Sequence, residues 1–300
     1  MKRFAMIGAA GYIAPRHMKA IKDLGGQLVA AYDVSDSVGI IDSISPDSEF
    51  FTEFERFSHY IYQLQRDKST KIDYIAICSP NYLHLPHIIL SMKMGCDVIC
   101  EKPLVLSESD IEEIKIVEKE TGKRLYNILQ LRLHDSVRQL KAKIEDELAQ
   151  DPNKQYDCEI QYITSRGKWY QESWKGDLRK SGGVATNIGV HFFDLLYHLF
   201  GEPIVNEKDF QCTHSSKGHL KFKNADVNWF LSVDSNDLPE EVKGKQNTFR
   251  AIKIGEDLVE FSKGFTDLHT VSYEEILAGH GFGVDEAKSC IKMTEFIRNQ

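Results

Sequence analysis

Short apolar runs alternate with amphipathic stretches over the first 125 residues, and this alternation constrains the fold more than any other feature of the chain. The apolar runs lie at 4–7, 28–32, 74–78, 98–100 and 125–128. The amphipathic stretches between them lie at 17–24, 59–66, 84–94 and 107–121. Strand–helix–strand repeats of this kind join parallel strands through crossover helices. The N-terminal part therefore predicts a doubly wound α/β fold.

The pattern changes after residue 128. A helix is predicted at 134–149, a strand at 156–165 and an apolar helix at 188–200. Short polar or glycine-bearing links then join segments that predict an antiparallel sheet, at 209–215, 219–223, 226–233, 247–254 and 257–261. Helical patterns at 269–279 and 284–299 close the chain. We expect a nucleotide-binding-type domain over 1–128 and an α+β domain over 129–300.

Composition limits the partners of this chain. Its 37 Lys and Arg against 45 Asp and Glu give a net charge of −8, so it has no general attraction for nucleic acid or for anionic membranes. The first apolar run ends at Gly8 and is too short for a signal-peptide core. No later run approaches membrane-spanning length. The six cysteines form no CxxC pair and no cluster with zinc spacing. We expect a cytoplasmic protein without disulfides or metal.

A glycine-containing turn follows the first predicted strand, with the sequence Ile7-Gly8-Ala9-Ala10-Gly11-Tyr12-Ile13-Ala14. Glycines here let backbone amides and a helix N-terminus approach a pyrophosphate. The GxGxxG pattern is incomplete, since Ala10 and Ile13 replace two glycines, and a plain tight turn is the alternative. Asp33 ends the second strand, where a carboxylate binds ribose hydroxyls and repels a 2′-phosphate. We predict NAD rather than NADP, bound by Gly8, Ala10, Gly11, Tyr12, Ile13 and Asp33.

Polar residues follow the apolar runs at 74–78 and 98–100, at carboxyl ends of strands where open α/β sheets bind ligands. The first group is Ser79-Pro80-Asn81 with His84, and the second is Glu101-Lys102-Pro103. A lysine that is partly desolvated at a strand end can transfer a proton, whereas the alternative is a surface lysine before a turn proline. We add these residues to the predicted cofactor site: Ser79, Pro80, Asn81, His84, Glu101 and Lys102.

The region 166–180 interrupts the acidic chain with five cations, namely Arg166, Lys168, Lys175, Arg179 and Lys180. They are interleaved with Trp169, Tyr170 and Trp174. Cations, aromatic planes and nearby glycines suit an anionic ligand that carries rings. The alternative is a solvated surface loop. We call 166–180 the cationic–aromatic segment.

Three motifs together resemble the glucose–fructose oxidoreductase/inositol dehydrogenase family. They are Glu101-Lys102-Pro103, the segment 79–84, and Asn187-Ile188-Gly189-Val190-His191-Phe192-Phe193-Asp194. The resemblance implies a Rossmann domain, an open-faced C-terminal sheet, homo-oligomers (dimer or tetramer) formed through that sheet, and hydride transfer at a sugar carbon. Lys102 and His191 match the family's catalytic pair. Asn187 stands where the family often has Asp.

Further segments resemble one subgroup, the UDP-N-acetylglucosaminuronic acid 3-dehydrogenases of bacterial lipopolysaccharide O-antigen synthesis. They lie at 130–134, 165–170, 173–177, 181–196, 264–269 and 273–277. This resemblance implies a UDP-sugar substrate and adds Gln130 to the cofactor site. The substrate-binding residues it implies are Arg132, Arg166, Lys168, Tyr170, Ser173, Trp174, Lys175, Asn187 and His191.

Alternatives to this function stay open. The substrate can be another UDP-sugar, or a free polyol or monosaccharide, although a neutral polyol does not need the cationic–aromatic segment. A regulator of the same fold that senses NAD or a sugar without turnover is a third possibility. It predicts loss of Lys102 or His191, and both are present. The sequence leaves open whether NADH is released or is reoxidised in place by a second substrate.

Overall fold

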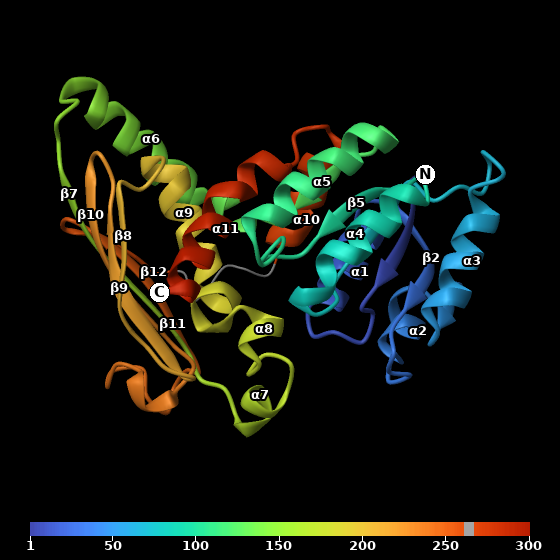
Figure 1. Cartoon of the computed structure of the whole chain (residues 1–300), viewed down its shortest axis with the longest axis horizontal. Coiled ribbons are helices and arrows are strands. Elements are labelled where there is room, and N and C mark those ends of the chain that lie inside the picture. Colours follow the sequence, from blue (N-terminus) through green and yellow to red (C-terminus); the bar gives the residue numbers. More distant parts are fainter. Residues whose placement is uncertain (261–266) are drawn as a thin grey trace. The chain divides into compact units, whose positions relative to one another are not determined.

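Six parallel strands build the N-terminal sheet of the computed structural model, which describes residues 1–260 and 267–300 (Figure 1). Their order across the sheet is β3-β2-β1-β4-β5-β6, the arrangement of a doubly wound nucleotide-binding fold. The strands are β1 (Arg3–Ile7), β2 (Gln27–Tyr32), β3 (Glu49–Phe51), β4 (Tyr74–Ile77), β5 (Asp97–Cys100) and β6 (Leu125–Asn127). This confirms the predicted α/β class. The short edge strand β3 was not predicted, because its apolar part is only Phe50 and Phe51.

The helices of this unit follow the amphipathic stretches. They are α1 (Ala14–Asp23), α2 (Ile40–Ile44), α3 (Phe54–Leu64), η1 (Asn81–Leu83), α4 (His84–Lys93), α5 (Glu108–Thr121) and α10 (Leu268–Leu277). Local signals set the ends of α5, because the Ser107 side chain accepts a hydrogen bond from the Ser109 amide and Gly122 adopts a left-handed conformation at φ +66°. The apolar faces pack into a core with Phe4, Met6 and Tyr273.

The first compact unit contains Met1–Ile128 and also Asp267–Ala287. The second contains Leu129–Thr266 and Lys288–Gln300. The sequence analysis placed 267–287 with the second domain, whereas the structure packs α10 against α1. The physical reason is burial: Tyr273 is fully buried, and its ring centroid lies 6.0 Å from that of Phe4. No local sequence signal marks a helix that returns to an earlier domain.

The second unit is built on a six-stranded sheet with the order β12-β11-β7-β10-β9-β8. Its strands are β7 (Tyr156–Thr164), β8 (Val205–Gln211), β9 (Ser215–Lys221), β10 (Ala225–Ser232), β11 (Thr248–Ile254) and β12 (Asp257–Glu260). Every pair is antiparallel except β7 with β10, which is parallel. The predicted α+β domain with a mainly antiparallel sheet is therefore confirmed.

Two predicted strands were misplaced. The strand expected at 209–215 is β8 at Val205–Gln211, and the strand expected at 219–223 is β9 at Ser215–Lys221. Residues 212–214 form the hairpin turn between them, where the Cys212 amide donates to the Ser215 carbonyl at 2.8 Å. The apolar pattern could not locate β8, because none of its residues is buried and an edge strand of this kind has no alternation to read. The end of the segment expected at 257–261 lies outside the described residues.

The helices of the second unit include α9, which covers one face of the sheet (Figure 1). Phe192 and Phe193 of α9 pack on Tyr162 and Trp229, with ring centroids 5.6 and 5.4 Å apart. Strand residues that point to the opposite face, such as Glu159, are exposed, so the sheet is open-faced. The other helices of this unit are η2 (Gln130–Leu133), α6 (Asp135–Gln150), α7 (Lys168–Glu172), α8 (Leu178–Ser181), η3 (Ala185–Gly189) and η4 (Ser235–Asp237). The helix α9 spans Val190–Phe200, and α11 (Val284–Asn299) begins in the first unit and continues into the second.

Within residues 1–260 and 267–300, none of the helices combines the length and the apolar character that a bilayer span requires.

Candidate active site

The turn after β1 brings backbone close to backbone, and only glycine fits at its first position. Gly8 has φ +89°, and a Cβ built on it would lie 2.5 Å from the carbonyl carbon of Cys78. The amides of Gly8 and Ala9 donate to the Tyr32 carbonyl at 2.8 and 3.1 Å. The turn leads through Gly11 and the highly exposed Tyr12 to Ile13, which caps the N-terminus of α1. The result is a tight turn that leads into the N-terminus of a helix, the arrangement that pyrophosphate binding uses.

Asp33 follows β2 and faces this turn. Its Oδ2 accepts a hydrogen bond from the Ala10 amide at 2.9 Å, and its Oδ1 accepts one from the Ser35 amide at 2.9 Å. The carboxylate is half-buried. The two hydrogen bonds hold a fixed negative charge beside the glycine turn. These residues therefore fit a dinucleotide that carries a free ribose 2′-hydroxyl.

The segments that follow β4 and β5 are tied together by His84. This buried imidazole lies with Nδ1 2.8 Å from the Pro103 carbonyl oxygen and with Nε2 2.9 Å from the Ser79 carbonyl oxygen. Burial lowers the pKa of His84, and the carbonyl contacts oppose that shift. The Ser79 hydroxyl lies 2.9 Å from His87 Nδ1. His84 is thus occupied by main chain, while Pro80 and Asn81 begin η1 beside it.

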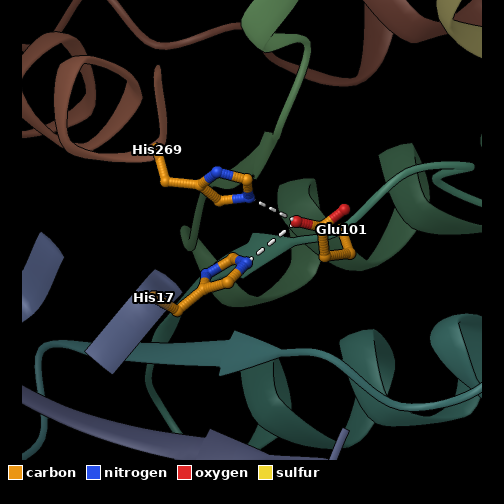
Figure 2. A group of neighbouring side chains, drawn as sticks. All are labelled: His17, Glu101 and His269. Atoms are coloured by element: carbon orange, nitrogen blue, oxygen red, sulfur yellow. Dashed lines mark hydrogen bonds and ion pairs between the residues drawn. The ribbon is translucent and has the colours of Figure 1, made fainter. Parts of the chain in front are cut away.

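Glu101 and Lys102 follow β5 directly, and Glu101 is buried. Figure 2 shows His17 and His269 pointing at one carboxylate oxygen of Glu101, Oε1, and each Nε2 lies 2.9 Å from it. The other oxygen, Oε2, accepts the Lys102 amide at 3.1 Å. His17 Nδ1 lies 2.8 Å from the Tyr273 hydroxyl. His17 is thus a buried histidine whose two ring nitrogens both have partners.

The ionisation of this cluster follows from its contacts. Burial raises the pKa of the Glu101 carboxyl, but the hydrogen bonds from His17 and His269 outweigh it and hold the pKa well below its usual range. Burial lowers the pKa of His17, so the ring is neutral at neutral pH. Burial raises the pKa of Tyr273 well above its usual range, so the phenol keeps its proton. Glu101 therefore carries one negative charge that accepts hydrogen bonds.

His17, Glu101 and His269 are also the one group of three potential metal ligands among the described residues, with ligand atoms within 4.8 Å of one another. Both imidazole nitrogens point at the same oxygen atom rather than at a common empty point (Figure 2). Their distances of 2.9 Å are those of hydrogen bonds. The geometry is that of a hydrogen-bonded cluster and does not revise the expectation of a metal-free chain.

In the second unit, the start of α9 carries His191, and Asn187 lies in the irregular segment η3 just before it. Asn187 Nδ2 donates to the Tyr170 hydroxyl at 2.6 Å. Tyr170 is buried, and burial raises its pKa while Asn187 opposes the shift. The structure therefore links two residues of the predicted substrate set, Tyr170 and Asn187, one turn before His191.

Arg132 is buried and paired with Asp194 of α9. Its Nε and Nη2 donate to the two carboxylate oxygens at 3.0 and 2.5 Å, and its guanidinium lies 5.8 Å from the Tyr197 ring centroid. Burial raises the pKa of Asp194, although Arg132 acts to lower it. The sequence analysis placed Arg132 at the substrate, whereas the structure engages it in a bidentate ion pair that the sequence did not predict.

The cationic–aromatic segment places Lys175 between two tryptophans. Its Nζ lies 4.8 Å from the Trp169 ring centroid and 5.1 Å from that of Trp174. Burial lowers the pKa of Lys175, and the nearby Arg166 adds to this. The Ser173 hydroxyl accepts the Lys175 amide at 3.3 Å and fixes the turn. Lys175 is thus the cation of this segment that the structure places against aromatic rings.

A cavity of about 350 Å³ opens beside this segment in the second unit. Its lining includes the cations Arg166 and Lys168 and the ring of Tyr170, and also the carboxylates of Glu172 and Asp234. The lining is therefore of mixed charge. Its cations and ring can contact a negatively charged ring compound.

The sequence analysis found some of these residues and missed others. In the first unit the predicted cofactor residues gather at carboxyl ends of strands, as expected. Gln130 belongs to the second unit, where its side chain is buried and Oε1 has no hydrogen-bond partner among the described residues. His269, Tyr273 and Asp194 were missed as partners of Glu101, His17 and Arg132. Only Asp194 had a signal, since it lies three residues after His191 in the quoted motif.

Family models match both halves of the chain. The description "oxidoreductase family, NAD-binding Rossmann fold" fits residues 2–128, and "oxidoreductase family, C-terminal alpha/beta domain" fits residues 154–289. The chain belongs to this family. The resemblance to the glucose–fructose oxidoreductase/inositol dehydrogenase family is confirmed, and the first unit is its NAD-binding domain.

Several of the similar proteins found individually are also dehydrogenases. The WlbA (WbpB) dehydrogenase from Thermus thermophilus, crystallised with NAD and alpha-ketoglutarate, is 47% identical over 99% of this chain and 95% of its own, with a TM-score of 0.93. Its complex with NAD and UDP-GlcNAcA gives 46% identity and the same TM-score. D-glucoside 3-dehydrogenase of Escherichia coli is 26% identical over 56% of this chain and 48% of its own.

A second curated relative, glucose-6-phosphate 3-dehydrogenase of Bacillus subtilis, is 24% identical over 69% of this chain and 56% of its own. The chain thus spans about half the length of the curated relatives it matches. It aligns with nearly the full length of the WlbA dehydrogenase from Thermus thermophilus.

Proposed function

We propose that this family member oxidises the 3-hydroxyl of UDP-N-acetylglucosaminuronate (UDP-GlcNAcA) to a ketone with NAD, in lipopolysaccharide O-antigen sugar synthesis. The observation that carries the proposal is the identity of 46% over 99% of the chain with a dehydrogenase crystallised with NAD and UDP-GlcNAcA. Two curated relatives are named 3-dehydrogenases of other sugars. The cations and rings of the cationic–aromatic segment supply the charge that a diphosphate and a uronate require.

The first unit supplies the cofactor residues in this proposal. The Gly8–Gly11 turn would let the pyrophosphate approach the backbone, the N-terminus of α1 would hold it, and Asp33 would accept hydrogen bonds from the adenosine ribose. Bound NAD supplies the acceptor for the hydride that leaves the sugar carbon. The other proposed contacts follow β4 and β5, at Ser79, Pro80, Asn81 and Lys102, with Gln130 in the second unit. Glu101 and His84 were also predicted to contact the cofactor, but their polar atoms are engaged within the protein.

Removal of the hydroxyl proton falls to Lys102 and His191. An alcohol loses its proton as it loses hydride, so a general base lowers the barrier. A lysine beside a cationic ring has a like-charged neighbour, which favours the neutral amine, and a histidine needs little shift to act near neutral pH. Asn187 accepts no proton, and its amide, held by Tyr170, would orient the sugar or the base.

Asp33→Ala is expected to weaken NAD binding about tenfold or more, because a hydrogen bond to a charged group contributes about 1.5–3 kcal/mol. It should also reduce discrimination against NADP, since the charge that repels a 2′-phosphate is gone. Asp33→Asn is the matched control: it can keep the contact with the Ala10 amide but lacks the charge. Cofactor titrations that leave the NAD/NADP preference unchanged in both variants would remove Asp33 from this role.

Arg166→Ala and Lys175→Ala are each expected to raise the dissociation constant of the UDP-sugar about tenfold, while NAD affinity stays nearly unchanged. Arg179→Ala is the control, because Arg179 is an exposed cation of the same segment that neither lines the cavity, as Arg166 does, nor lies over the tryptophan rings, as Lys175 does. Calorimetry with UDP-GlcNAcA measures the effect. Wild-type affinity for UDP-GlcNAcA in all three variants would show that the segment is only a solvated surface.

The function itself is tested by incubation with NAD and a panel of UDP-sugars and free polyols, followed by mass spectrometry of the products. A 3-keto product from UDP-GlcNAcA is expected. A free polyol or monosaccharide is the second candidate, favoured by the curated relatives that are named for sugars without a nucleotide. Oxidation of such a sugar and not of UDP-GlcNAcA would replace the proposal. The panel is run with and without alpha-ketoglutarate, because a 2-oxo acid that is reduced to a hydroxy acid would reoxidise NADH.

Two further parts of the proposal concern assembly and location. The open face of the second sheet would pair with another copy of the chain to give a dimer or tetramer. Both ligands are anionic metabolites that a bilayer retains, which supports a cytoplasmic location. Light scattering on the purified protein tests the assembly.

A further inference from the structure

We propose that Glu101, His17, His269 and Tyr273 form a positioning network that holds the main chain of Lys102 for proton transfer. The inference rests on the proposed function in one respect, since it takes Lys102 as the catalytic lysine. Glu101 directly follows β5, His17 lies on α1, and both His269 and Tyr273 lie on α10. All four belong to the first unit. None of them is assigned a catalytic step above, and the network acts through Lys102.

The peptide groups before Lys102 are fixed by buried partners. The Glu101 amide donates to the Ile77 carbonyl at 3.0 Å and so continues the pairing of β5 with β4. Asn127 Nδ2 donates to the carbonyls of Cys100 and Glu101 at 2.9 and 3.2 Å. The Lys102 amide then donates to Glu101 Oε2 at 3.1 Å. The direction of the chain as it enters Lys102 therefore depends on where the Glu101 carboxylate is held.

The main chain one residue beyond Lys102 is fixed as well. His84 Nδ1 lies 2.8 Å from the Pro103 carbonyl oxygen. Lys102 is thus bracketed by main-chain groups that buried side chains hold on both sides. A lysine side chain is long and flexible, so fixing its main chain limits the positions that its ammonium can reach.

The carboxylate of Glu101 is held in turn by His17 and His269, which both lie 2.9 Å from Oε1. A buried carboxylate is stable only with such donors, because the loss of hydration is otherwise uncompensated. Tyr273 orders the donors: its hydroxyl donates to His17 Nδ1 at 2.8 Å, which leaves the Nε2 hydrogen of His17 to face Glu101. In the series Tyr273, His17, Glu101, each hydrogen bond therefore has a fixed donor and a fixed acceptor.

Glu101→Gln tests the network with a side chain of the same shape. The amide replaces one acceptor oxygen with an NH₂ group, which must face either the Lys102 amide or the two imidazole donors. In the ligand-free protein, hydrogen exchange at the Lys102 amide is expected to rise at least tenfold. With ligands, the single-turnover rate of NAD reduction should fall about 100-fold, the effect of a misplacement of about 1 Å. The dissociation constants of NAD and UDP-GlcNAcA should stay within threefold of wild type.

Two more variants separate positioning from stability. Ile114→Val removes a buried methyl group from α5 of the same unit; it should lower the melting temperature and leave both readouts unchanged. Tyr273→Phe removes only the hydroxyl that orders His17, and it should give a smaller fall in rate than Glu101→Gln. A rate that follows the melting temperature across all three variants would overturn the proposal.

Lys102→Ala provides the background that isolates the pathway. If the network acts through Lys102, Glu101→Gln should add no further loss of rate to Lys102→Ala. If Glu101→Gln lowers the single-turnover rate by the same factor in wild type and in Lys102→Ala, the inference is overturned. It is also overturned if Glu101→Gln weakens NAD affinity and leaves the rate unchanged, because Glu101 would then be a direct cofactor contact. One equivalent of metal that is lost in His269→Gln would overturn it too. If wild type does not oxidise UDP-GlcNAcA, the proposed function fails, and unchanged hydrogen exchange in Glu101→Gln is the separate result that refutes the network.

Discussion

Lys102→Ala and His191→Ala are each expected to fold and bind both ligands but to lose about 10²–10⁴-fold in turnover, the usual contribution of general-base assistance. Lys102 follows the carboxyl end of β5, and His191 lies in the first turn of α9. These are positions from which a side chain can act on a bound ligand without disturbing the core. Single-turnover reduction of NAD, followed by absorbance, separates the chemical step from product release.

Matched controls make this result specific. Lys93→Ala removes an exposed lysine from the last turn of α4, and it should leave the rate unchanged. Lys102→Arg keeps a positive charge but cannot lose its proton in a protein, so it should be as slow as Lys102→Ala if the lysine is the base. Rates like wild type in both Lys102→Ala and His191→Ala would remove the pair from the mechanism and favour the regulator.

Asp194→Asn is expected to destabilise the second unit by about 3–5 kcal/mol, the effect of breaking a buried ion pair by changing one partner. The variant keeps the volume of the side chain but leaves the Arg132 guanidinium buried without its counter-charge. All three tryptophans, Trp169, Trp174 and Trp229, lie in the second unit. Tryptophan fluorescence during urea unfolding therefore reports on this unit selectively.

The control for Asp194→Asn is the double variant Arg132→Met with Asp194→Leu. Replacing both charges with apolar groups of similar size is often neutral, so the double variant should recover most of the lost stability. It also tests whether Arg132 binds substrate, as the sequence suggested. A double variant that is stable and still binds UDP-GlcNAcA would limit Arg132 to the ion pair. An Asp194→Asn protein that unfolds at the wild-type urea concentration would show that the pair contributes little.

Much of the fold was readable from the sequence because its signals are local. Both ends of the helix α5 are marked in the sequence, by Ser107 and by Gly122. The buried strands of the first sheet are continuous apolar runs. The strand β8 was misplaced because its residues are at most half-buried. The signal that places a strand is burial, and an exposed edge carries little of it.

In the candidate site too, the residues with a local sequence signal were predicted and those without one were not. Asp33 and Lys102 were found because they follow strands, a position defined by the local pattern. The partners of Glu101 were not found, because His269 lies 168 residues away in sequence and lies on a helix whose apolar pattern does not say which core it joins. Likewise, Asp194 was visible as part of a motif, but its pairing with Arg132 depends on how α9 packs. Contacts of this kind exist only after the chain has folded.

The return of residues 267–287 to the first unit bears on how modular the protein is. A nucleotide-binding domain of this type is often treated as a contiguous piece that can be excised or exchanged between enzymes. Here a piece cut at residue 128 would lack α10, so Glu101 would lose His269, His17 would lose Tyr273 and the core beside Phe4 would open. A chimaera that transfers cofactor preference must therefore carry two separate segments of the chain. Recombination within this family is expected to preserve α1 and α10 together.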